Sequence, residues 1–306
     1  MGAGAVGGYY GAALAGRGHA VTFVARGEHL RAMRERGLAV KSGGRVTVLH
    51  PVDAVAEPSA SGGGELDLVL FTVKGYDTDA AAVALRPALG ARTAVLTLQN
   101  GVDSGERLSA VLGADRVLVG TTLIATTIAE PGVIEQANPI RRIELGEPSG
   151  AITTRVELIA TALRDAGVDV SVTTDVQRAV WEKFVRLAPG ATLATVCRAT
   201  IGEVRSTPEG AALYRALIAE TVAVGRAAGA ALPPDAVETA VRLIQALPAD
   251  MRTSMQLDFE RRRRVELEEL TGAVVRLGRR LGVPTPVYDV LYAVLKVRAR
   301  AFDGLG

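Results

Sequence analysis

The sequence predicts an α/β fold, with an N-terminal Rossmann-type doubly wound parallel sheet followed by an all-helical C-terminal domain. Two observations lead to this prediction. Up to about residue 173, short apolar runs rich in Val, Leu and Thr alternate with stretches of helical spacing. Beyond that point, long segments rich in Ala, Leu, Val and Arg replace the strand-like runs. Alternating strands and helices are typical of a parallel sheet covered on both faces. We therefore expect a Rossmann-type domain at residues 1–173 and a helical substrate and catalytic domain at 174–306.

The individual elements follow from the period of the apolar residues. Short runs bounded mostly by Gly or polar residues predict strands at 20–25, 66–72, 93–98, 117–120 and 169–173. Helical spacing predicts helices at 9–15, 27–36, 77–89, 176–185, 207–228, 235–246 and 266–281. The change from mixed to purely helical pattern after residue 173 sets the expected domain boundary.

Composition narrows the class of protein. Charged residues make up 22% of the chain and apolar residues 48%, which is typical of a globular protein. A net charge of +2 provides no footprint for nucleic acid. The single cysteine, Cys197, excludes an internal disulfide and a Cys-rich zinc site, so we expect a reducing compartment and no metal. The uncharged first 16 residues lack a basic start and are shorter than the ~20 residues of a membrane span, so we expect a cytoplasmic protein without a membrane anchor.

The chain opens with MGAGAVGGYYGA, in which Gly2, Gly4 and Gly7 form a G-x-G-x-x-G motif. This motif binds dinucleotides when it forms the turn between a strand and a helix. The alternative is an Ala/Gly-rich helix start, but the following helix and the strand ending near Arg26 favour the cofactor turn. No strand precedes the motif. We expect that the first strand is missing from this reading frame through a misassigned start.

Arg26 lies where an NAD-binding unit carries an acidic residue for the ribose 2′-hydroxyl. An arginine at that place suits a 2′-phosphate, because its planar fork can make two charge-assisted hydrogen bonds. The pattern therefore favours NADPH over NADH. The alternative is an ordinary solvated side chain at the end of a strand.

Only four lysines stand among the 35 basic residues, namely Lys41, Lys74, Lys183 and Lys296. An ammonium with a lowered pKa can give up a proton, whereas a guanidinium effectively cannot. All three histidines lie in the first fifty residues, so a proton donor in the helical domain must be another group. Lys183 is the candidate, with a helix-surface lysine as the alternative. Lys74 follows a strand at the edge where doubly wound sheets bind ligands, unless it is a solvated loop residue.

At these residues the sequence resembles the ketopantoate reductase (2-dehydropantoate 2-reductase) family of pantothenate biosynthesis. The resemblance covers essentially the whole chain. In the first half it is carried by GAGAVGGYYGA, VTFVARG, TVKGYD, LQNGVD and VGTT. In the second half it is carried by WEKF, GEVRSTPE, SMQLDFERRRRVELEELTG and GVPTP. Together these segments are specific, although none is so alone.

The resemblance implies a set of cofactor contacts. The glycines would shape the phosphate turn and Arg26 would meet the 2′-phosphate. The residues expected at NADPH are Gly2, Gly4, Ala5, Val6, Gly7, Arg26, Lys74 and Asn100.

The resemblance also implies the catalytic and substrate-binding residues. Lys183 would be the general acid that protonates the carbonyl oxygen, and Glu266 the carboxylate that holds lysine and substrate in place. Asn100 and Ser254 would bind the substrate, and Ser254 would contact the carboxylate of the substrate. Ser254 and Glu266 are roughly 18 Å apart along an unbroken helix, at ~1.5 Å per residue. Both can reach one small substrate only if the chain bends, so we expect a helix break between them.

The sequence departs from the family pattern on the helix that carries Lys183. Leu187 and Ala191 stand where the family has asparagines that help to hold the substrate. Pro189 lies between them and is expected to kink or end the helix. A site without hydrogen-bond donors has no strong reason to favour a hydroxylated substrate.

The sequence therefore predicts NADPH-dependent reduction of 2-dehydropantoate to pantoate, an oxidoreductase reaction at a CH–OH group. The first alternative is a related enzyme acting on a less polar small 2-keto acid or a secondary alcohol. The second is a nucleotide-binding sensor without catalysis, against which Lys183, Glu266 and Ser254 argue. The expected partner is a small 2-keto acid, with no nucleic acid and no membrane. The oligomeric state is open, with a homodimer slightly favoured.

Overall fold

The computed structural model describes residues 1–60 and 65–300 of the chain. The chain divides into two compact units. The first, the α/β unit, comprises Met1–Gln99 and Asp103–Ala179. The second, the helical unit, comprises Asn100–Val102 and the chain from Val180 onward. The boundary expected at residue 173 lies a few residues before this division. The sequence pattern did not predict that Asn100–Val102 would group with the helical unit.

The centre of the α/β unit is a mixed sheet. In spatial order its strands are β3 (Arg45–Leu49), β2 (Leu38–Ser42), β8 (Val133–Gly146), β7 (Val117–Glu130), β6 (Ala94–Thr97) and β5 (Leu68–Phe71), with β9 (Asp169–Val172) pairing with β8. Strands β5, β6 and β7 run parallel, and the long β7–β8 hairpin is antiparallel. The parallel part carries buried apolar runs, as expected for strands that are covered on both faces.

A small parallel sheet of β1 (Thr22–Val24) and β4 (Asp53–Val55) lies beside the large one. The first residues of the chain connect the two. The Met1 ammonium donates to the Leu70 carbonyl (2.9 Å), and Thr72 N–H donates to the Met1 carbonyl (3.0 Å). Ala3 N–H in turn donates to the Val24 carbonyl (2.8 Å). Residues 1–3 therefore continue the strand ladder from β5 to β1 and lead directly into the first helix.

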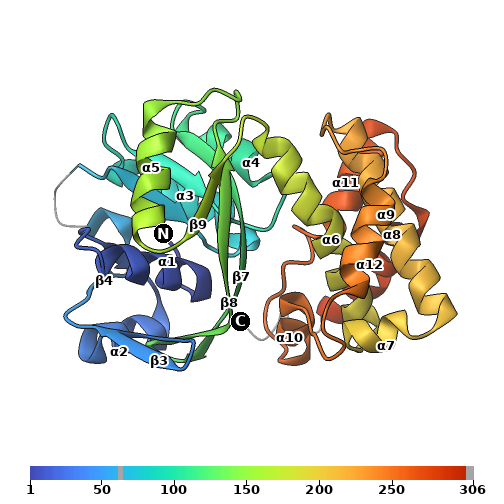
Figure 1. The fold of residues 1–306 in the computed structure, drawn as a ribbon, viewed down its shortest axis with the longest axis horizontal. Helices are drawn as coiled ribbons and strands as arrows, with labels where there is room; N and C mark the ends of the chain where they lie inside the picture. The colour runs from blue at the N-terminus through green and yellow to red at the C-terminus, as the bar shows by residue number, and fades with distance from the viewer. Residues whose placement is uncertain (61–64, 301–306) are drawn as a thin grey trace. The chain divides into compact units, whose positions relative to one another are not determined.

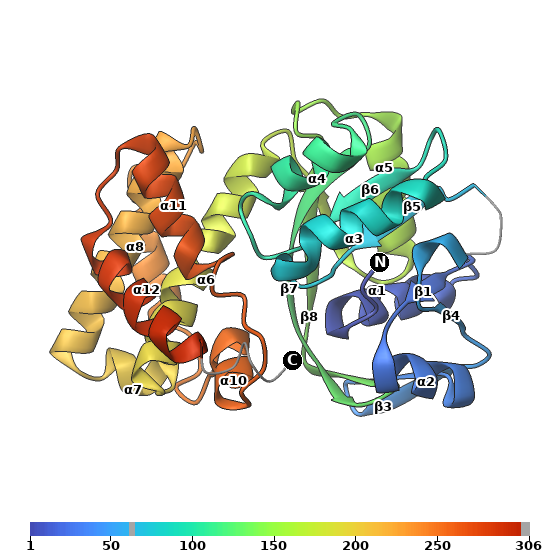
Figure 2. The same cartoon turned by 180° about the vertical axis from the view of Figure 1, so that it is seen from behind.

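Helices cover both faces of the large sheet (Figures 1 and 2). The helices of one face are α1 (Ala5–Ala15) and α5 (Thr154–Asp165), and those of the other are α3 (Thr78–Leu85) and α4 (Ser104–Leu112). Two separate apolar clusters lie between these helix pairs and the sheet. Helix α2 (Gly27–Arg36) follows β1, and short 3-10 turns occupy Pro58–Ala60, Gly75–Asp77 and Arg86–Ala88. The predicted doubly wound arrangement is thereby confirmed.

The helical unit is built around α6 (Val176–Cys197). The remaining helices are α7 (Ile201–Arg205), α8 (Pro208–Ala227), α9 (Ala236–Gln245), α10 (Ser254–Glu260), α11 (Thr271–Leu281) and α12 (Pro286–Ala299). One apolar cluster joins α6, α8, α11 and α12. None of the described helices is long and apolar enough to span a membrane.

Helix α6 continues through Pro189 to Cys197, so of the two expected outcomes the end of the helix at Pro189 is wrong, and the kink stays a prediction. The reason is packing on both sides of the proline. Ala188, Ala191, Leu193 and Ala194 are all buried in the core of the helical unit. Their burial offsets the backbone hydrogen bond that a proline cannot donate.

Candidate active site

The glycine turn joins residues 1–3 to α1, and its glycines are required by the backbone. Gly2 has φ +84°, a conformation that only glycine adopts without strain. A Cβ on Gly7 would overlap the Thr72 hydroxyl and the Gly2 carbonyl. Thr72 Oγ1 donates to that carbonyl (2.9 Å), which holds the turn against the end of β5. The first helix can therefore approach the strands only with glycine at position 7.

The N-terminus of α1 is suited to bind a phosphate group. Gly4 is the N-cap, no side chain caps the helix, and its first turn carries no acidic residue. A Cβ on Gly4 would meet no atom within 4 Å, so open space adjoins the helix end. Helix N-terminal N–H groups and the helix dipole favour an anion at such a place. The turn with Ala5, Val6 and Gly7 thus fits the pyrophosphate of a dinucleotide.

Arg26 lies at the end of β1 as the N-cap of α2. Its side chain is 67% exposed and forms a long ion pair (3.8 Å) with Asp77. Asp77 is the last residue of the 3-10 turn that follows Lys74 at the carboxyl end of β5. Arg26 and the turn after Lys74 are therefore neighbours, although about fifty residues separate them. Sequence reasoning missed Asp77, whose only signal is its position three residues after Lys74.

Lys183 and Asn100 meet within the helical unit. Lys183 is half-buried in the second turn of α6, and its Nζ donates to Asn100 Oδ1 at 2.9 Å. Asn100 belongs to the segment Asn100–Val102, which leaves the end of β6 and groups with the helices. Two residues predicted for the site, 83 positions apart, are thus joined by a hydrogen bond.

The Lys183 ammonium has a perturbed pKa. Burial lowers the pKa of Lys183 to about 8, because the charged form loses its hydration. The Glu266 carboxylate raises this pKa in part, and the nearby Arg186 guanidinium lowers it again. Arg186 was not predicted for the site, although it lies one helical turn from Lys183. A lysine poised near neutral pH is able to donate a proton in catalysis.

The predicted break between Ser254 and Glu266 is confirmed. Helix α10 ends at Glu260, and Arg262 adopts a left-handed conformation with φ +53°. Arg263 N–H bonds to the Asp258 carbonyl (2.9 Å), which closes the helix end. The predicted helix at 266–281 begins only at Thr271, so Glu266 lies in the turn before it.

The two predicted residues at either end of this break differ in their exposure. Glu266 is buried (6% exposed) and acts electrostatically on Lys183. Ser254 is exposed on the first turn of α10. The role of each residue at a substrate stays a prediction.

The two positions that depart from the family pattern lie on α6 beyond Lys183. Ala191 is buried in the core of the helical unit, and Leu187 is half-buried against the same cluster. Neither side chain can donate or accept a hydrogen bond. Leu187 therefore offers a partly exposed apolar side chain one turn after Lys183, whereas Ala191 is enclosed in the core.

Comparison with known proteins agrees with this geometry. Residues 1–150 match the family model "Ketopantoate reductase PanE/ApbA", and residues 175–299 match its C-terminal model. A 2-dehydropantoate 2-reductase of Halobacterium salinarum is 36% identical, with 98% of each chain covered. The crystal structure of a PanE/ApbA family ketopantoate reductase from Ralstonia eutropha superposes with a TM-score of 0.90 at 33% identity, covering 99% of this chain and 98% of that one. D-Mandelate dehydrogenase shares the fold, with a TM-score of 0.89 at 18% identity. The chain therefore belongs to the ketopantoate reductase family and is an oxidoreductase.

Proposed function

We propose that this protein reduces 2-dehydropantoate to pantoate with NADPH, in pantothenate biosynthesis, and that Lys183 is the general acid. The observation that carries the proposal is the Lys183–Asn100 hydrogen bond of 2.9 Å at a lysine whose pKa is lowered to about 8. Membership of the ketopantoate reductase family supports the substrate class and a nicotinamide cofactor.

The α/β unit would hold the cofactor, which supplies the hydride when bound. The uncapped first turn of α1, with Gly2, Gly4, Ala5, Val6 and Gly7, would bind the pyrophosphate. Arg26 would bind the 2′-phosphate, and its exposure leaves the guanidinium accessible. Lys74 would contact the cofactor from the carboxyl end of β5.

The helical unit would supply the proton and hold the substrate. As negative charge develops on the carbonyl oxygen, the Lys183 ammonium stabilises it and transfers a proton to it. Asn100 fixes the direction of the lysine side chain by accepting its hydrogen bond. Glu266 keeps the lysine protonated, since its carboxylate raises the lysine pKa against the effect of burial. Ser254 would bind the substrate carboxylate.

A second candidate function is reduction of a less polar 2-keto acid, and the apolar side chains of Leu187 and Ala191 favour it. The rates of NADPH oxidation with 2-dehydropantoate and with 2-ketoisovalerate distinguish the two functions, because only 2-dehydropantoate carries a hydroxyl group. A clear preference for 2-dehydropantoate supports the first function. A preference for 2-ketoisovalerate supports the second, and NADPH binding without turnover of any keto acid would indicate a sensor.

Replacing Lys183 by Ala tests the general acid. We expect kcat to fall by about 10²- to 10⁴-fold, the usual contribution of a positioned acid. The Kd for NADPH, measured by the fluorescence of the bound cofactor, should stay within a factor of a few. Lys296→Ala is the matched control, since Lys296 is an exposed lysine of the same unit that pairs with Glu268. Equal loss of kcat and of cofactor affinity in Lys183→Ala would contradict the assignment.

Replacing Arg26 by Asp tests the choice of cofactor. We expect kcat/KM for NADPH to fall by about ten- to a hundredfold, because charge-assisted hydrogen bonds to the 2′-phosphate are lost. Activity with NADH should be retained or improved, since a carboxylate can accept a hydrogen bond from the ribose. An unchanged ratio of the two kcat/KM values would show that Arg26 does not contact the phosphate.

A further inference from the structure

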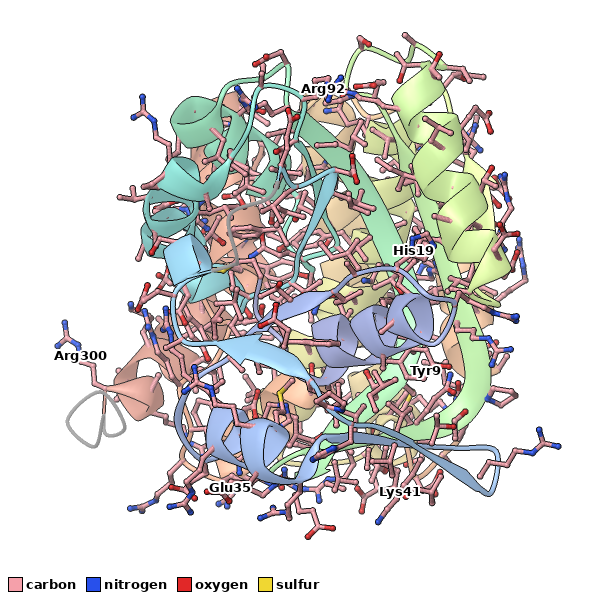
Figure 3. The ribbon with its side chains drawn as sticks, turned by 90° about the vertical axis from the view of Figure 1, so that its left-hand side faces the viewer. Tyr9, His19, Glu35, Lys41, Arg92 and Arg300 are labelled. Atoms are coloured by element: carbon pink, nitrogen blue, oxygen red, sulfur yellow. The ribbon has the colours of Figure 1, made fainter. Side chains whose placement is uncertain are left out.

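A cavity of about 670 Å³ lies wholly within the α/β unit, between the second half of α1, the β2–β3 hairpin and the start of β8. Ala12, Ala13 and Gly16 of α1 line one wall, and their small side chains leave the space open. In Figure 3, Tyr9 lies on the α1 side of the β2–β3 hairpin and Lys41 on the opposite side. Gly16 is about 18 Å along the helix from Gly4, so this end of the cavity lies away from the glycine turn.

The charged groups around this cavity have one sign. Arg17, Arg45 and Arg141 belong to its lining, which contains no acidic residue. Arg141 is anchored, because its Nε donates to the Gly167 carbonyl at 2.5 Å. Arg17 and Arg45 are exposed, and neither side chain has a hydrogen bond or ion pair in the part of the chain that the structure describes. Three cations without a counter-charge around one hollow favour an anion.

The floor of the cavity is rigid and its polar groups are satisfied. Gln136 is 6% exposed, and its Oε1 accepts hydrogen bonds from Tyr9 OH (3.0 Å) and Ser42 Oγ (2.5 Å). Its Nε2 donates to the Ile140 carbonyl (3.0 Å). Because these groups satisfy one another, the lining presents a mainly apolar surface to a ligand. Its apolar residues are Ala12, Ala13, Val40, Leu49, Ala137 and Pro139.

We propose that this cavity binds an amphipathic organic anion, with a carboxylate held by Arg17 and Arg45 and a short apolar chain against the floor. The volume lies in the range of small-molecule sites, and arginine forks match carboxylate oxygens in geometry and charge. The proposal is independent of the function proposed above, since none of these residues belongs to the candidate active site.

Isothermal titration calorimetry of the full chain with octanoate tests the proposal. We expect one bound octanoate and at least tenfold weaker binding in the double variant Arg17→Ala/Arg45→Ala. Arg280→Ala is the control, because Arg280 is also an exposed arginine but lies in the helical unit, and this variant should bind octanoate as the wild type does. Octan-1-ol and inorganic phosphate should each bind far more weakly than octanoate, since one lacks the charge and the other the apolar chain.

A second variant blocks the space and keeps the charges. Ala13→Leu fills the cavity from the helix side and should also weaken octanoate binding at least tenfold. No octanoate binding by the wild-type chain, or equal binding by the wild type and the double arginine variant, would overturn the proposal. Binding that is lost in Lys183→Ala and kept in the arginine variant would place octanoate at the candidate active site and would overturn it equally.

Discussion

The α/β unit and the helical unit each withdraw a charged side chain from water, wholly for Glu147 and in part for Lys183, and they surround it in opposite ways. Glu147, at the end of β8, is 4% exposed and accepts hydrogen bonds from Thr153 Oγ1 (2.6 Å) and from Arg155 Nε and Nη2 (2.7 and 2.6 Å). Lys183 gives its hydrogen bond to the neutral Asn100, and the Glu266 and Arg186 charges act on it in opposite directions.

The pKa shifts express this difference. Burial alone would raise the pKa of Glu147, but the hydrogen bonds from Arg155 and Thr153 hold it below its usual value. For Lys183, burial prevails and lowers the pKa to about 8. A buried group whose charge is fully paired and hydrogen-bonded stays ionised and is structural. A group whose charge is only partly paired is able to change protonation state. Burial therefore leaves the carboxylate of the α/β unit ionised and brings the lysine of the helical unit close to a change of protonation.

The largest expected effect on stability is that of Glu147→Gln. It should lower the free energy of unfolding by about 2 kcal/mol, because the hydrogen bonds to the buried carboxylate weaken and the half-buried Arg155 guanidinium loses its counter-charge. Urea unfolding measures the change. Glu238→Gln is the matched control, since Glu238 pairs with Arg215 at the surface, where ion pairs contribute little to stability. Equal effects of the two variants would show that the buried Glu147 pair stabilises the fold no more than an exposed pair does.

A smaller effect of opposite sign is expected for Lys183→Met. This change removes a partly compensated buried cation and keeps an apolar chain of similar length. The free energy of unfolding should be unchanged or rise by about 1 kcal/mol, as in other proteins where a functional charge costs stability. A loss as large as that of Glu147→Gln would show that Lys183 is a structural charge.

The two residues also differ in how their contributions to stability depend on pH. The lowered pKa of Glu147 adds stability above its ordinary unfolded value of about 4.3, and this is lost as pH falls through the folded pKa. The stability gap between the wild type and Glu147→Gln should therefore narrow in acid. The Lys183 pKa of about 8 lies below the ordinary ~10.4, so the wild type should gain stability relative to Lys183→Met between these two values.

The proposed role of Lys183 as the general acid predicts that the same pKa also governs the pH dependence of catalysis. The general acid must be protonated, so kcat/KM should be constant below pH 8 and fall about tenfold per pH unit above it. Stability and activity should thus respond to alkali in opposite directions. A rate that stays constant to pH 10 would exclude Lys183 as the proton donor.

The elements that the sequence predicts best are those with a strong local pattern. The expected helix at 27–36 coincides with α2, and the strands at 66–72 and 93–98 contain β5 and β6. The β7–β8 hairpin was largely missed, because only residues 117–120 of β7 form an apolar run. Its outer half is mostly exposed and shows neither the alternation nor the continuous apolar run of a buried strand.

The sequence by itself determined the class of fold, the glycine turn and the identity of the candidate residues. These depend on local requirements: the period of apolar residues, the need for glycine at φ +84°, and the rarity of lysine. Only the tertiary structure decided which of the candidates meet. Asn100 reaches Lys183 because the segment Asn100–Val102 packs with the helices, and the lysine pKa falls because the surrounding helices exclude water. Desolvation and the meeting of distant residues are properties of packing, which no local pattern encodes.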